Sequence, residues 1–239
     1  MKAHIITLVD DQDSVAQAIA CVESHRAVKN DFDIGVFEAT TAENVVREML
    51  DAKLQWNYPF NGQEFLDMAT GLRKRGYETA DPKKRMACFM SHYRLWQKCV
   101  EENESMIVLE HDATWLDKFD ATNLEYSSRT VISLNRPEPG ATPRAGEYDT
   151  AIIRQVGQKE LPVVVDVPYV FPREVPAGLP GNSAYYIKPA GAKKLIKLVK
   201  EFGAWPNDAI MCKQLMRNDL GCMYPYVTTV QKNESSTTL

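Results

Sequence analysis

The chain has 239 residues, of which 44% are hydrophobic and 25% charged, so it is long enough for one large α/β domain of ordinary composition. Its net charge of −4 argues against the broad basic surface that binds along a nucleic acid. The five cysteines are odd in number and include no C-x-x-C pair, so they indicate neither a disulfide framework nor a zinc knuckle and favour a reducing cytoplasm.

The chain begins with an apolar stretch at residues 4 to 9, which predicts a strand and is far too short for a secretory signal. Residues 13 to 29 have helical spacing, and residues 33 to 39 predict a second strand. Strand, helix and strand at this spacing form a βαβ unit, whose two strands we expect to lie parallel. Since no apolar run approaches the ~20 residues that cross a bilayer, we expect a cytoplasmic protein without a transmembrane segment.

Residues 41 to 51 predict a second helix, and residues 52 to 84 form a mixed segment whose structure the sequence does not indicate. The following helix is amphipathic, and its apolar residues recur at steps of three or four: Met86, Met90, Tyr93, Trp96 and Val100. Cys88 and Cys99 lie three turns apart on this helix, where we expect small buried hydrophobic residues. Nucleophilic chemistry is not expected of Cys88, because no residue besides His92 can be identified as its partner.

The apolar run at residues 106 to 109 predicts a central strand, and it ends in the triplet Glu110-His111-Asp112. On a strand, side chains i and i+2 point the same way. Glu110 and Asp112 would therefore converge on one ion, with His111 pointing elsewhere, provided that the extended backbone lasts through Asp112. Mg²⁺ and Mn²⁺ prefer such oxygen ligands. The alternatives are that Asp112 caps a helical turn at residues 115 to 119, or that the acids only solvate a loop.

Two further strands are predicted at residues 130 to 134 and 161 to 167. Between them, residues 135 to 150 are too rich in proline and glycine for regular structure, and residues 168 to 182 form a second such loop. Long irregular connections in a compact domain are usually functional or mobile. Both loops are therefore candidate walls or lids of a substrate cleft, and the alternative is that they are surface insertions.

The last third of the chain predicts a strand at residues 183 to 187 and a helix at about 190 to 201, whose lysines lie mainly on a solvated face. The segment WPND at residues 205 to 208 opens another helix, because proline is favoured near the first turn. Asp208 at this position either serves the start of the helix or takes part in catalysis.

Several of these segments together resemble the signature of glycosyltransferase family 25, which includes lipopolysaccharide and collagen galactosyltransferases. CFMSHYRLW at 88 to 96 is similar to the family motif G-C-x-x-S-H-x-x-x-W, and IVLEHDA at 107 to 113 is similar to I-L-E-D-D-A. Later segments that fit in the family's order lie at residues 130 to 136, 182 to 196, 205 to 211 and 224 to 237. The ordered set is more specific than any single motif.

Two segments depart from the family pattern. The family opens with a strand followed by Asn-Leu and an arginine pair, whereas this chain has HIITLVDDQDS and no arginine before Arg26. The acidic triplet has His111 where the family usually has an aspartate, but Glu110 and Asp112 both remain. The metal site implied by the resemblance therefore survives the change.

The resemblance implies a single GT-A-like nucleotide-sugar-binding domain, with a mostly parallel central sheet flanked by helices. Residues 1–112 would form the nucleotide-sugar-binding half and residues 113–239 the acceptor-binding half. It also implies that Glu110 and Asp112 hold Mn²⁺ or Mg²⁺ and that Asp208 is the general base. The donor-binding residues that it implies are Thr7, Leu8, His92, His111, Asn182 and Ser183.

We therefore expect a metal-dependent glycosyltransferase of lipopolysaccharide biosynthesis that moves a galactose-like hexose from a nucleotide-sugar donor, usually UDP-linked, to a sugar or other hydroxyl acceptor with inversion. In such a transfer a carboxylate takes the proton of the acceptor hydroxyl, and a metal stabilises the departing diphosphate. One alternative is a metal-dependent nucleotidyltransferase or phosphohydrolase, because a carboxylate pair at a strand end serves phosphate chemistry generally. Another is an inactive family member that binds sugar or nucleotide.

Overall fold

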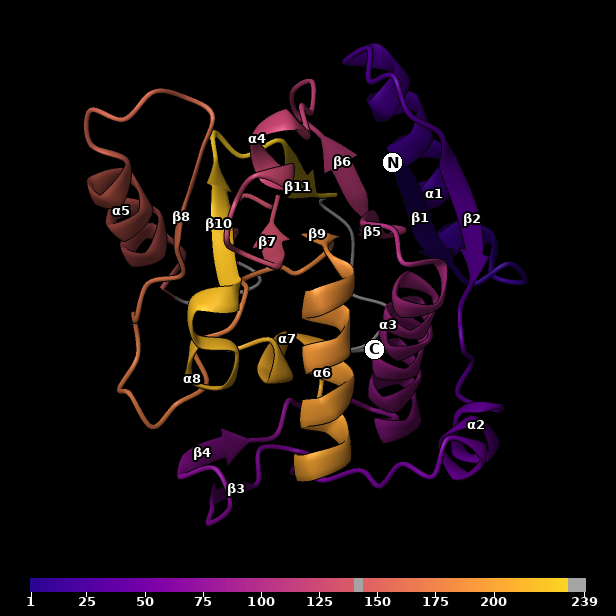
Figure 1. Ribbon diagram of the computed structural model, residues 1–239. Helices are drawn as coiled ribbons and strands as arrows, with labels where there is room; N and C mark the ends of the chain where they lie inside the picture. Colours follow the sequence, from indigo (N-terminus) through magenta and orange to yellow (C-terminus); the bar gives the residue numbers. More distant parts are fainter. Residues whose placement is uncertain (140–143, 232–239) are drawn as a thin grey trace.

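The structure is a computed structural model that describes residues 1–139 and 144–231. Parts of two segments considered above, the irregular stretch 135 to 150 and the motif at 224 to 237, lie outside the described residues. Figure 1 shows the arrangement of the elements, with a central sheet and helices on both of its faces.

The central sheet has seven strands in the order β2-β1-β5-β9-β7-β10-β8. Its strands are β1 (Lys2–Thr7), β2 (Ile34–Glu38), β5 (Met106–Glu110), β7 (Val131–Ser133), β8 (Val163–Asp166), β9 (Ala184–Ile187) and β10 (Leu220–Tyr224). The neighbours β2/β1, β1/β5 and β7/β10 are parallel, whereas β9 and β8 pair antiparallel with theirs. Five strands therefore run in one direction and two in the other, which confirms the predicted mostly parallel α/β sheet.

Two smaller sheets and the helices surround this sheet. β3 (Glu64–Asp67) pairs with β4 (Leu72–Arg75), and β6 (Ala113–Trp115) pairs with β11 (Thr228–Val230). The helices are α1 (Gln12–Ala27), α2 (Val45–Asp51), α3 (Pro82–Glu102), α4 (Thr122–Glu125), α5 (Ala145–Val156), α6 (Pro189–Phe202), α7 (Asn207–Ile210) and α8 (Lys213–Met216), and a 3₁₀ turn η1 (Arg217–Asp219) follows α8.

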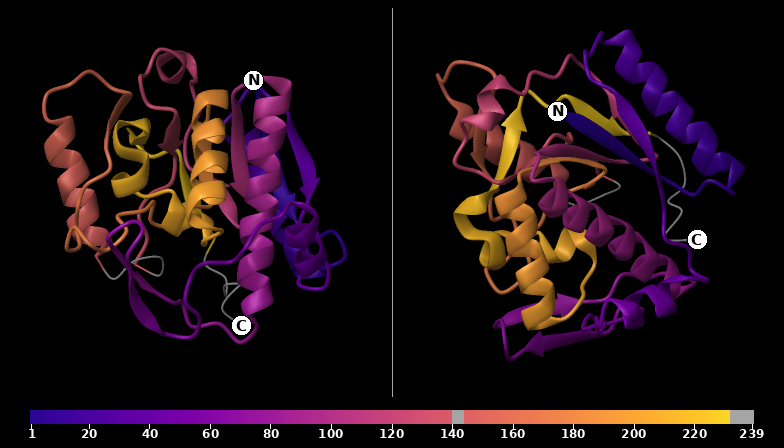
Figure 2. Two further views of the ribbon diagram at one scale, coloured as in Figure 1. Left: turned by 60° about the horizontal axis from the view of Figure 1, so that its bottom comes forward. Right: turned by 45° about the vertical axis from the view of Figure 1, so that its right-hand side comes forward.

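Strand β5 lies at the centre of the core because apolar side chains cover both of its faces. Met106 and Val108 belong to the hydrophobic cluster under α3 and α6, whereas Ile107 and Leu109 belong to the cluster under α1 and β6. All four are buried, as the continuous apolar run predicts for a strand covered on both faces. Figure 2 shows α3 and α6 side by side on one face of the sheet and α1 across from them.

Helix α3 carries most of the site described below, and local signals fix its start and end. The side chain of Asp81 accepts a hydrogen bond from the backbone N–H of Lys83, and Pro82 occupies the first turn, where its missing N–H costs nothing. The helix ends at Asn103, which adopts a left-handed conformation with φ 52°. Phe89 and Trp96 are fully buried on its inner face.

Three local expectations are wrong or incomplete. Residues 113–115 form strand β6, so the helical turn proposed at 115 to 119 is wrong. The mixed segment 52 to 84 contains the β3–β4 hairpin. The segment 135 to 150 was expected to lack regular structure, yet α5 begins at Ala145, because a stripe of Tyr148, Ile152 and Val156 at helical spacing packs into the core. The second loop, residues 168 to 182, contains no helix or strand, as predicted.

Candidate active site

The predicted site residues lie where parallel strands β1 and β5 end side by side. Glu110 is the last residue of β5 and pairs in register with Ile6 of β1. Helix α3 presents His92 toward this edge, and its hydroxyl neighbour Ser91 accepts a hydrogen bond from the backbone N–H of Thr40 at 2.9 Å. Ligands of open α/β sheets bind outside the carboxyl ends of the strands, so this edge is the expected place for a site.

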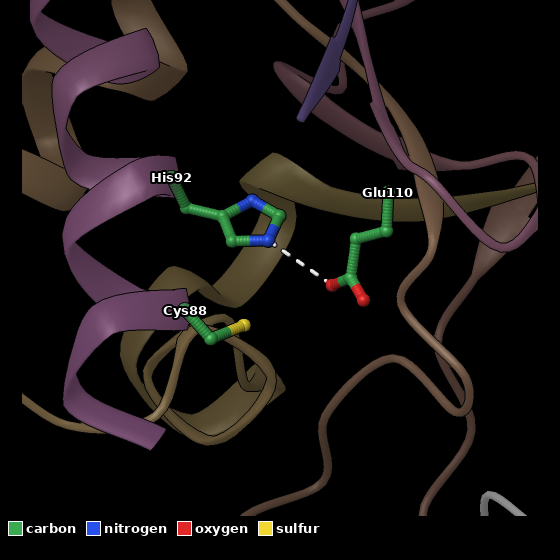
Figure 3. A group of neighbouring side chains, drawn as sticks. All are labelled: Cys88, His92 and Glu110. Carbon is green, nitrogen blue, oxygen red and sulfur yellow. Dashed lines mark hydrogen bonds and ion pairs between the residues drawn. The ribbon is translucent and has the colours of Figure 1, made fainter. Parts of the chain in front are cut away.

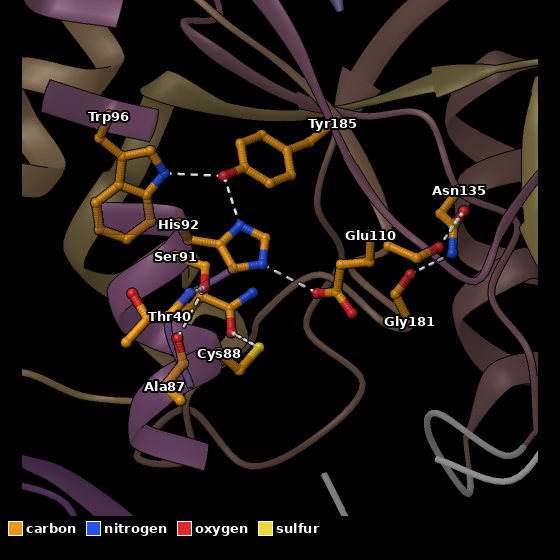
Figure 4. Close-up of polar contacts among 12 residues, drawn as sticks. Thr40, Ala87, Cys88, Ser91, His92, Trp96, Glu110, Asn135, Gly181 and Tyr185 are labelled. Atoms are coloured by element: carbon orange, nitrogen blue, oxygen red, sulfur yellow. Dashed lines mark hydrogen bonds and ion pairs between the residues drawn. The ribbon is translucent and has the colours of Figure 1, made fainter. Parts of the chain in front are cut away.

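A chain of hydrogen bonds leads from the core to Glu110 (Figure 4). The Trp96 indole N–H donates to the Tyr185 hydroxyl at 2.8 Å, and that hydroxyl lies 2.9 Å from Nδ1 of His92. Nε2 of His92 lies 3.1 Å from Oε1 of Glu110. An indole N–H can only donate, so the Tyr185 hydroxyl accepts from Trp96 and gives its own proton to Nδ1. Nε2 then carries the imidazole proton and donates it to Glu110.

This arrangement keeps Glu110 ionised. Burial alone raises the pKa of its carboxyl group, but the hydrogen bond from His92 and the favourable electrostatic interaction with the same ring outweigh burial, with smaller contributions from His111 and Arg85. The net pKa is lowered. His92 therefore orients and stabilises the Glu110 carboxylate at the end of the strand. The donor-binding role that the family resemblance implied for His92 stays a prediction.

Asp112 does not continue the strand. Strand β5 ends at Glu110, and His111 and Asp112 form a turn before β6, so the extended backbone on which the convergence of the two carboxylates depended stops one residue too early. The carboxylates still interact. Burial and then the charge of Glu110 raise the pKa of Asp112 to about 7. Among the described residues, Oδ1 of Asp112 is a buried oxygen with no hydrogen-bond partner.

A hard divalent cation would compensate the negative charge of two interacting carboxylates, one of which has a buried oxygen without a hydrogen-bond partner. Leaving such a group unpaired is costly, and an ion that accepts both carboxylates would remove the desolvation cost and the repulsion together. The donor set of Glu110 and Asp112 therefore fits Mn²⁺ or Mg²⁺.

Asp208 lies in the short helix α7, near the same group of charges. Its Oδ2 accepts a hydrogen bond of 3.0 Å from the Tyr77 hydroxyl. Burial raises the pKa of Asp208 and the charge of Glu110 raises it further, while Arg85 and the Tyr77 hydrogen bond oppose the rise. The net pKa is raised, which moves this carboxylate toward the range in which a general base works well.

A cavity of about 610 Å³ opens beside Asp208. The β3–β4 hairpin contributes Arg75 to its wall, and the irregular segment 168 to 182 contributes Phe171 and Gly178. The prediction that this second loop lines a cleft is therefore confirmed. Aromatic side chains at Tyr77 and Phe171 and polar groups at the rim give the cavity the mixed character of a sugar-sized site.

A second cavity, of about 250 Å³, lies at the carboxyl ends of β1 and β2. Leu8 lines it together with Asp10, Asp11 and Glu38. Three carboxylates make this pocket unsuitable for a diphosphate, but they can accept hydrogen bonds from ribose hydroxyls or a base. Thr7 does not line this cavity; it is buried, and its hydroxyl donates to the Ile5 carbonyl at 3.3 Å.

The remaining predicted donor-binding residues also lie near Glu110. The Ser183 carbonyl accepts a hydrogen bond from the backbone N–H of Glu110 at 2.7 Å, and the Ser183 hydroxyl donates to Asn135. The side-chain oxygen and nitrogen of Asn182 are both buried without a hydrogen-bond partner among the described residues. His111 interacts with the charges of Glu110 and Asp11, and burial lowers its pKa.

Two residues of the site, Arg85 and Tyr77, were not predicted from the sequence. Arg85 stacks on the Tyr77 ring at 4.8 Å and acts electrostatically on Glu110 and Asp208, and Tyr77 holds Asp208. A signal for Arg85 exists, because Lys83, Lys84 and Arg85 fill the first turn of α3, where the helix dipole disfavours cations. Tyr77 lies in the segment that the sequence left unassigned, and nothing local distinguishes it.

The chain was compared with known proteins. The model of glycosyltransferase family 25 (LPS biosynthesis protein) matches residues 25–135, a range that contains His92, Glu110 and Asp112. No curated protein matches the chain. The described part of the chain holds no helix with the length and apolar character that a membrane span requires.

Three solved structures that match the chain have low sequence identity and TM-scores below 0.5. An active-site mutant of LgtC has 9% identity and a TM-score of 0.47, covering 98% of this chain and 88% of that one. The galactosyltransferase LgtC in complex with donor and acceptor sugar analogues has 9% identity and a TM-score of 0.44, covering 98% and 87%. Mouse xyloside xylosyltransferase 1 has 11% identity and a TM-score of 0.45, covering 92% and 82%.

The matched segment, together with the α/β sheet and the site at its edge, defines a glycosyltransferase. Within that class the chain is similar to glycosyltransferase family 25 over residues 25–135. The expected resemblance and enzyme class are thereby confirmed, and the matched range ends before Asn182 and Asp208.

Proposed function

We propose that the chain is a metal-dependent, inverting hexosyltransferase in which Glu110 and Asp112 hold Mn²⁺ or Mg²⁺. The observation that carries this proposal is the buried, unpartnered carboxylate oxygen of Asp112 next to Glu110, at the carboxyl end of the central sheet. When bound, the cation would supply positive charge against the diphosphate that leaves the donor.

The nucleotide-sugar donor occupies the edge formed by β1, β2 and β5. The acidic pocket beside Leu8 takes the nucleoside, whose hydroxyls can donate to Asp10 and Glu38. Arg85 provides a fixed positive charge for the diphosphate. Asn182 supplies an unpaired amide for the donor. Residues 1–112 remain the donor half in this proposal, and residues 113–239 the acceptor half. The exceptions are Arg75 and Tyr77, which line the acceptor cavity, and Asn182, which serves the donor.

Asp208 acts on the acceptor from the wall of the large cavity. An acceptor hydroxyl in this cavity attacks the anomeric carbon, the new C–O bond forms as the bond to the diphosphate breaks, and the hydroxyl proton passes to Asp208. Tyr77 holds the carboxylate in position by its hydrogen bond of 3.0 Å. Attack from the face opposite the leaving group gives inversion.

The finer identity of the reaction rests on the family. From the similarity to family 25 we propose a galactose-like hexose, a UDP donor and a place in lipopolysaccharide biosynthesis. The five cysteines are all free thiols, which supports the cytoplasm as the compartment.

The test is turnover of UDP-hexoses with a mixture of sugar acceptors, with and without Mn²⁺. We expect Asp112→Asn to lose the Mn²⁺-dependent rate, and Asp208→Asn to lose at least about a hundredfold in turnover because the general base is gone. Donor binding should persist in Asp208→Asn. Hydrolysis or nucleotidyl exchange without sugar transfer would favour the phosphate-transfer alternative, and metal-independent binding without turnover would favour an inactive family member.

A further inference from the structure

Cys88 lies beside the His92–Glu110 pair and is not used by the proposed reaction. Figure 3 shows the three side chains facing a common space, Cys88 and His92 from α3 and Glu110 from β5. The Cys88 sulfur, a His92 ring nitrogen and a Glu110 carboxylate oxygen all lie within 4.8 Å of one another. Cys88 and His92 are four residues apart on a helix, a spacing that places two ligands on one face.

We propose that Cys88, His92 and Glu110 form a second cation site, which binds Zn²⁺. Zn²⁺ bonds to sulfur at about 2.3 Å and to nitrogen at about 2.0 Å, so tetrahedral ligand atoms lie roughly 3–4 Å apart. The His92–Glu110 separation of 3.1 Å already fits this geometry, and the remaining separations, none above 4.8 Å, need to close by at most roughly 1 Å. Cys88 and Glu110 are partly exposed, which leaves room for water as a fourth ligand and a path for the ion.

The ligand His92 already has the support that a zinc-binding histidine normally has. Its Nδ1 lies 2.9 Å from the Tyr185 hydroxyl, and Trp96 holds that hydroxyl from the other side. When Nε2 binds the ion, the ring proton moves to Nδ1 and is donated to Tyr185. Partners of this kind fix the ring orientation of metal-binding histidines. The Cys88 thiol loses its proton to solvent as the sulfur–zinc bond forms.

The chemistry of the ligands separates this site from the Glu110–Asp112 pair. Thiolate and imidazole select Zn²⁺, whereas two carboxylates select Mg²⁺ or Mn²⁺. Glu110 belongs to both sets. Zn²⁺ at Cys88 and His92 therefore draws Glu110 away from Asp112, and we expect it to inhibit sugar transfer. This consequence rests on the proposed function, whereas the binding of Zn²⁺ does not.

Binding is tested with Co²⁺, which replaces Zn²⁺ and reports a thiolate ligand by a sulfur-to-cobalt charge-transfer band in the near ultraviolet. The reduced full-length protein should show this band, Cys88→Ser should lose it, and Cys99→Ser on the same helix should keep it. Added Zn²⁺ should bleach the band. Absence of the band in the wild-type protein, or its persistence in Cys88→Ser, would overturn the proposal.

The inhibitory consequence is measured separately. In the Mn²⁺-dependent transfer assay, the Zn²⁺ concentration that halves the rate should rise at least about tenfold in Cys88→Ser, relative to wild type and Cys99→Ser, because one of three ligands is lost. If Zn²⁺ inhibits all three proteins equally, the proposed competition between the two cation sites for Glu110 is overturned. A Cys88-dependent cobalt band in a protein without Mn²⁺-dependent transfer would sink the proposed function and leave the zinc site standing.

Discussion

At the scale of single residues, Tyr77 controls the charge of Asp208. Its hydroxyl donates to Oδ2 of Asp208 and stabilises the ionised carboxylate, against the burial that raises the pKa of this group. A general base must be ionised before it can accept the acceptor proton. Activity should therefore fall as the pH drops through the pKa of Asp208.

We predict that Tyr77→Phe moves the acidic limb of the kcat/KM profile to higher pH. Without the hydrogen bond, the ionised form of Asp208 loses a stabilising partner, and its pKa rises further. Rates measured with saturating donor from acidic to neutral pH would reveal the displacement. The rate well above the limb should be less affected. If the acidic limb of Tyr77→Phe stays at the wild-type pH, the profile reports a group other than Asp208.

The acidic triplet marks how far single residues could be predicted. Glu110 and Asp112 could be placed together because an apolar run that ends in acids marks a strand end, and both belong to one charged cluster. The turn at His111 could not be predicted, because it depends on the pairing of β6 with β11, more than a hundred residues later in the chain. Tyr77 reaches the site from a segment that the sequence left unassigned, and Arg85 reaches it from the first turn of α3 only through tertiary packing.

At the scale of elements, the β3–β4 hairpin is attached to the protein through Lys74. This side chain is fully buried, and its Nζ lies 2.7 Å from Asp67, 2.8 Å from the Asn57 carbonyl and 3.7 Å from the centre of the Trp205 ring. The strand LRKR alternates Leu72 and Lys74 inward. Because one of the two inward-facing residues is a lysine, the strand does not alternate hydrophobic and polar residues. The hairpin could therefore not be predicted from the hydrophobic pattern.

We predict that Asp67→Asn destabilises the protein by about 3–5 kcal/mol, because it leaves the buried ammonium of Lys74 without its counter-charge. Glu64→Gln in the same hairpin breaks the exposed pair with Arg73 and should cost at most about 1 kcal/mol. Urea unfolding of the two variants would measure both values. Similar losses of unfolding free energy in the two variants would show that the buried ion pair stabilises the protein no more than the exposed one.

The second irregular loop, residues 168 to 182, packs closely against α7 at Gly178. A Cβ at this position would collide with the backbone carbonyl of Asp208, so only glycine allows the loop to pack this closely. The contact sets the position of the cavity wall relative to the carboxylate. No local sequence pattern reports such a contact, although the proline-rich loop was correctly predicted to line a cleft.

We predict that Gly178→Ala raises KM for the acceptor and lowers kcat by at least about tenfold, because misplacing a catalytic group by about 1 Å can cost a hundredfold. The KM for the nucleotide-sugar donor should change little, since the donor pocket lies at the ends of β1 and β2. Gly146→Ala is the matched control, because its Cβ would meet nothing within 4 Å. If Gly178→Ala has wild-type kinetics, the second irregular loop is not part of the acceptor site.

At the scale of the whole molecule, two cavities and one cluster of interacting carboxylates are built from different elements. The smaller cavity is formed by the ends of β1 and β2, and the larger by the hairpin, the second loop and α7. Glu110 interacts electrostatically with both Asp112 and Asp208. Like charges this close oppose folding, and a bound cation would remove part of that cost.

Binding of a donor should therefore stabilise the folded protein only when the cation is present. At a free donor concentration of about 100 times Kd, stabilisation is about 2.7 kcal/mol, which raises Tm by roughly 5–10 °C for a chain of this size. We predict this rise for a UDP-hexose with Mn²⁺, and a much smaller one with EDTA. Asp112→Asn should lose the Mn²⁺-dependent part, and Asp208→Asn should keep it, because only the first removes a ligand. An equal rise with Mn²⁺ and with EDTA would show that the donor binds without the ion, and the carboxylate pair would then need another role.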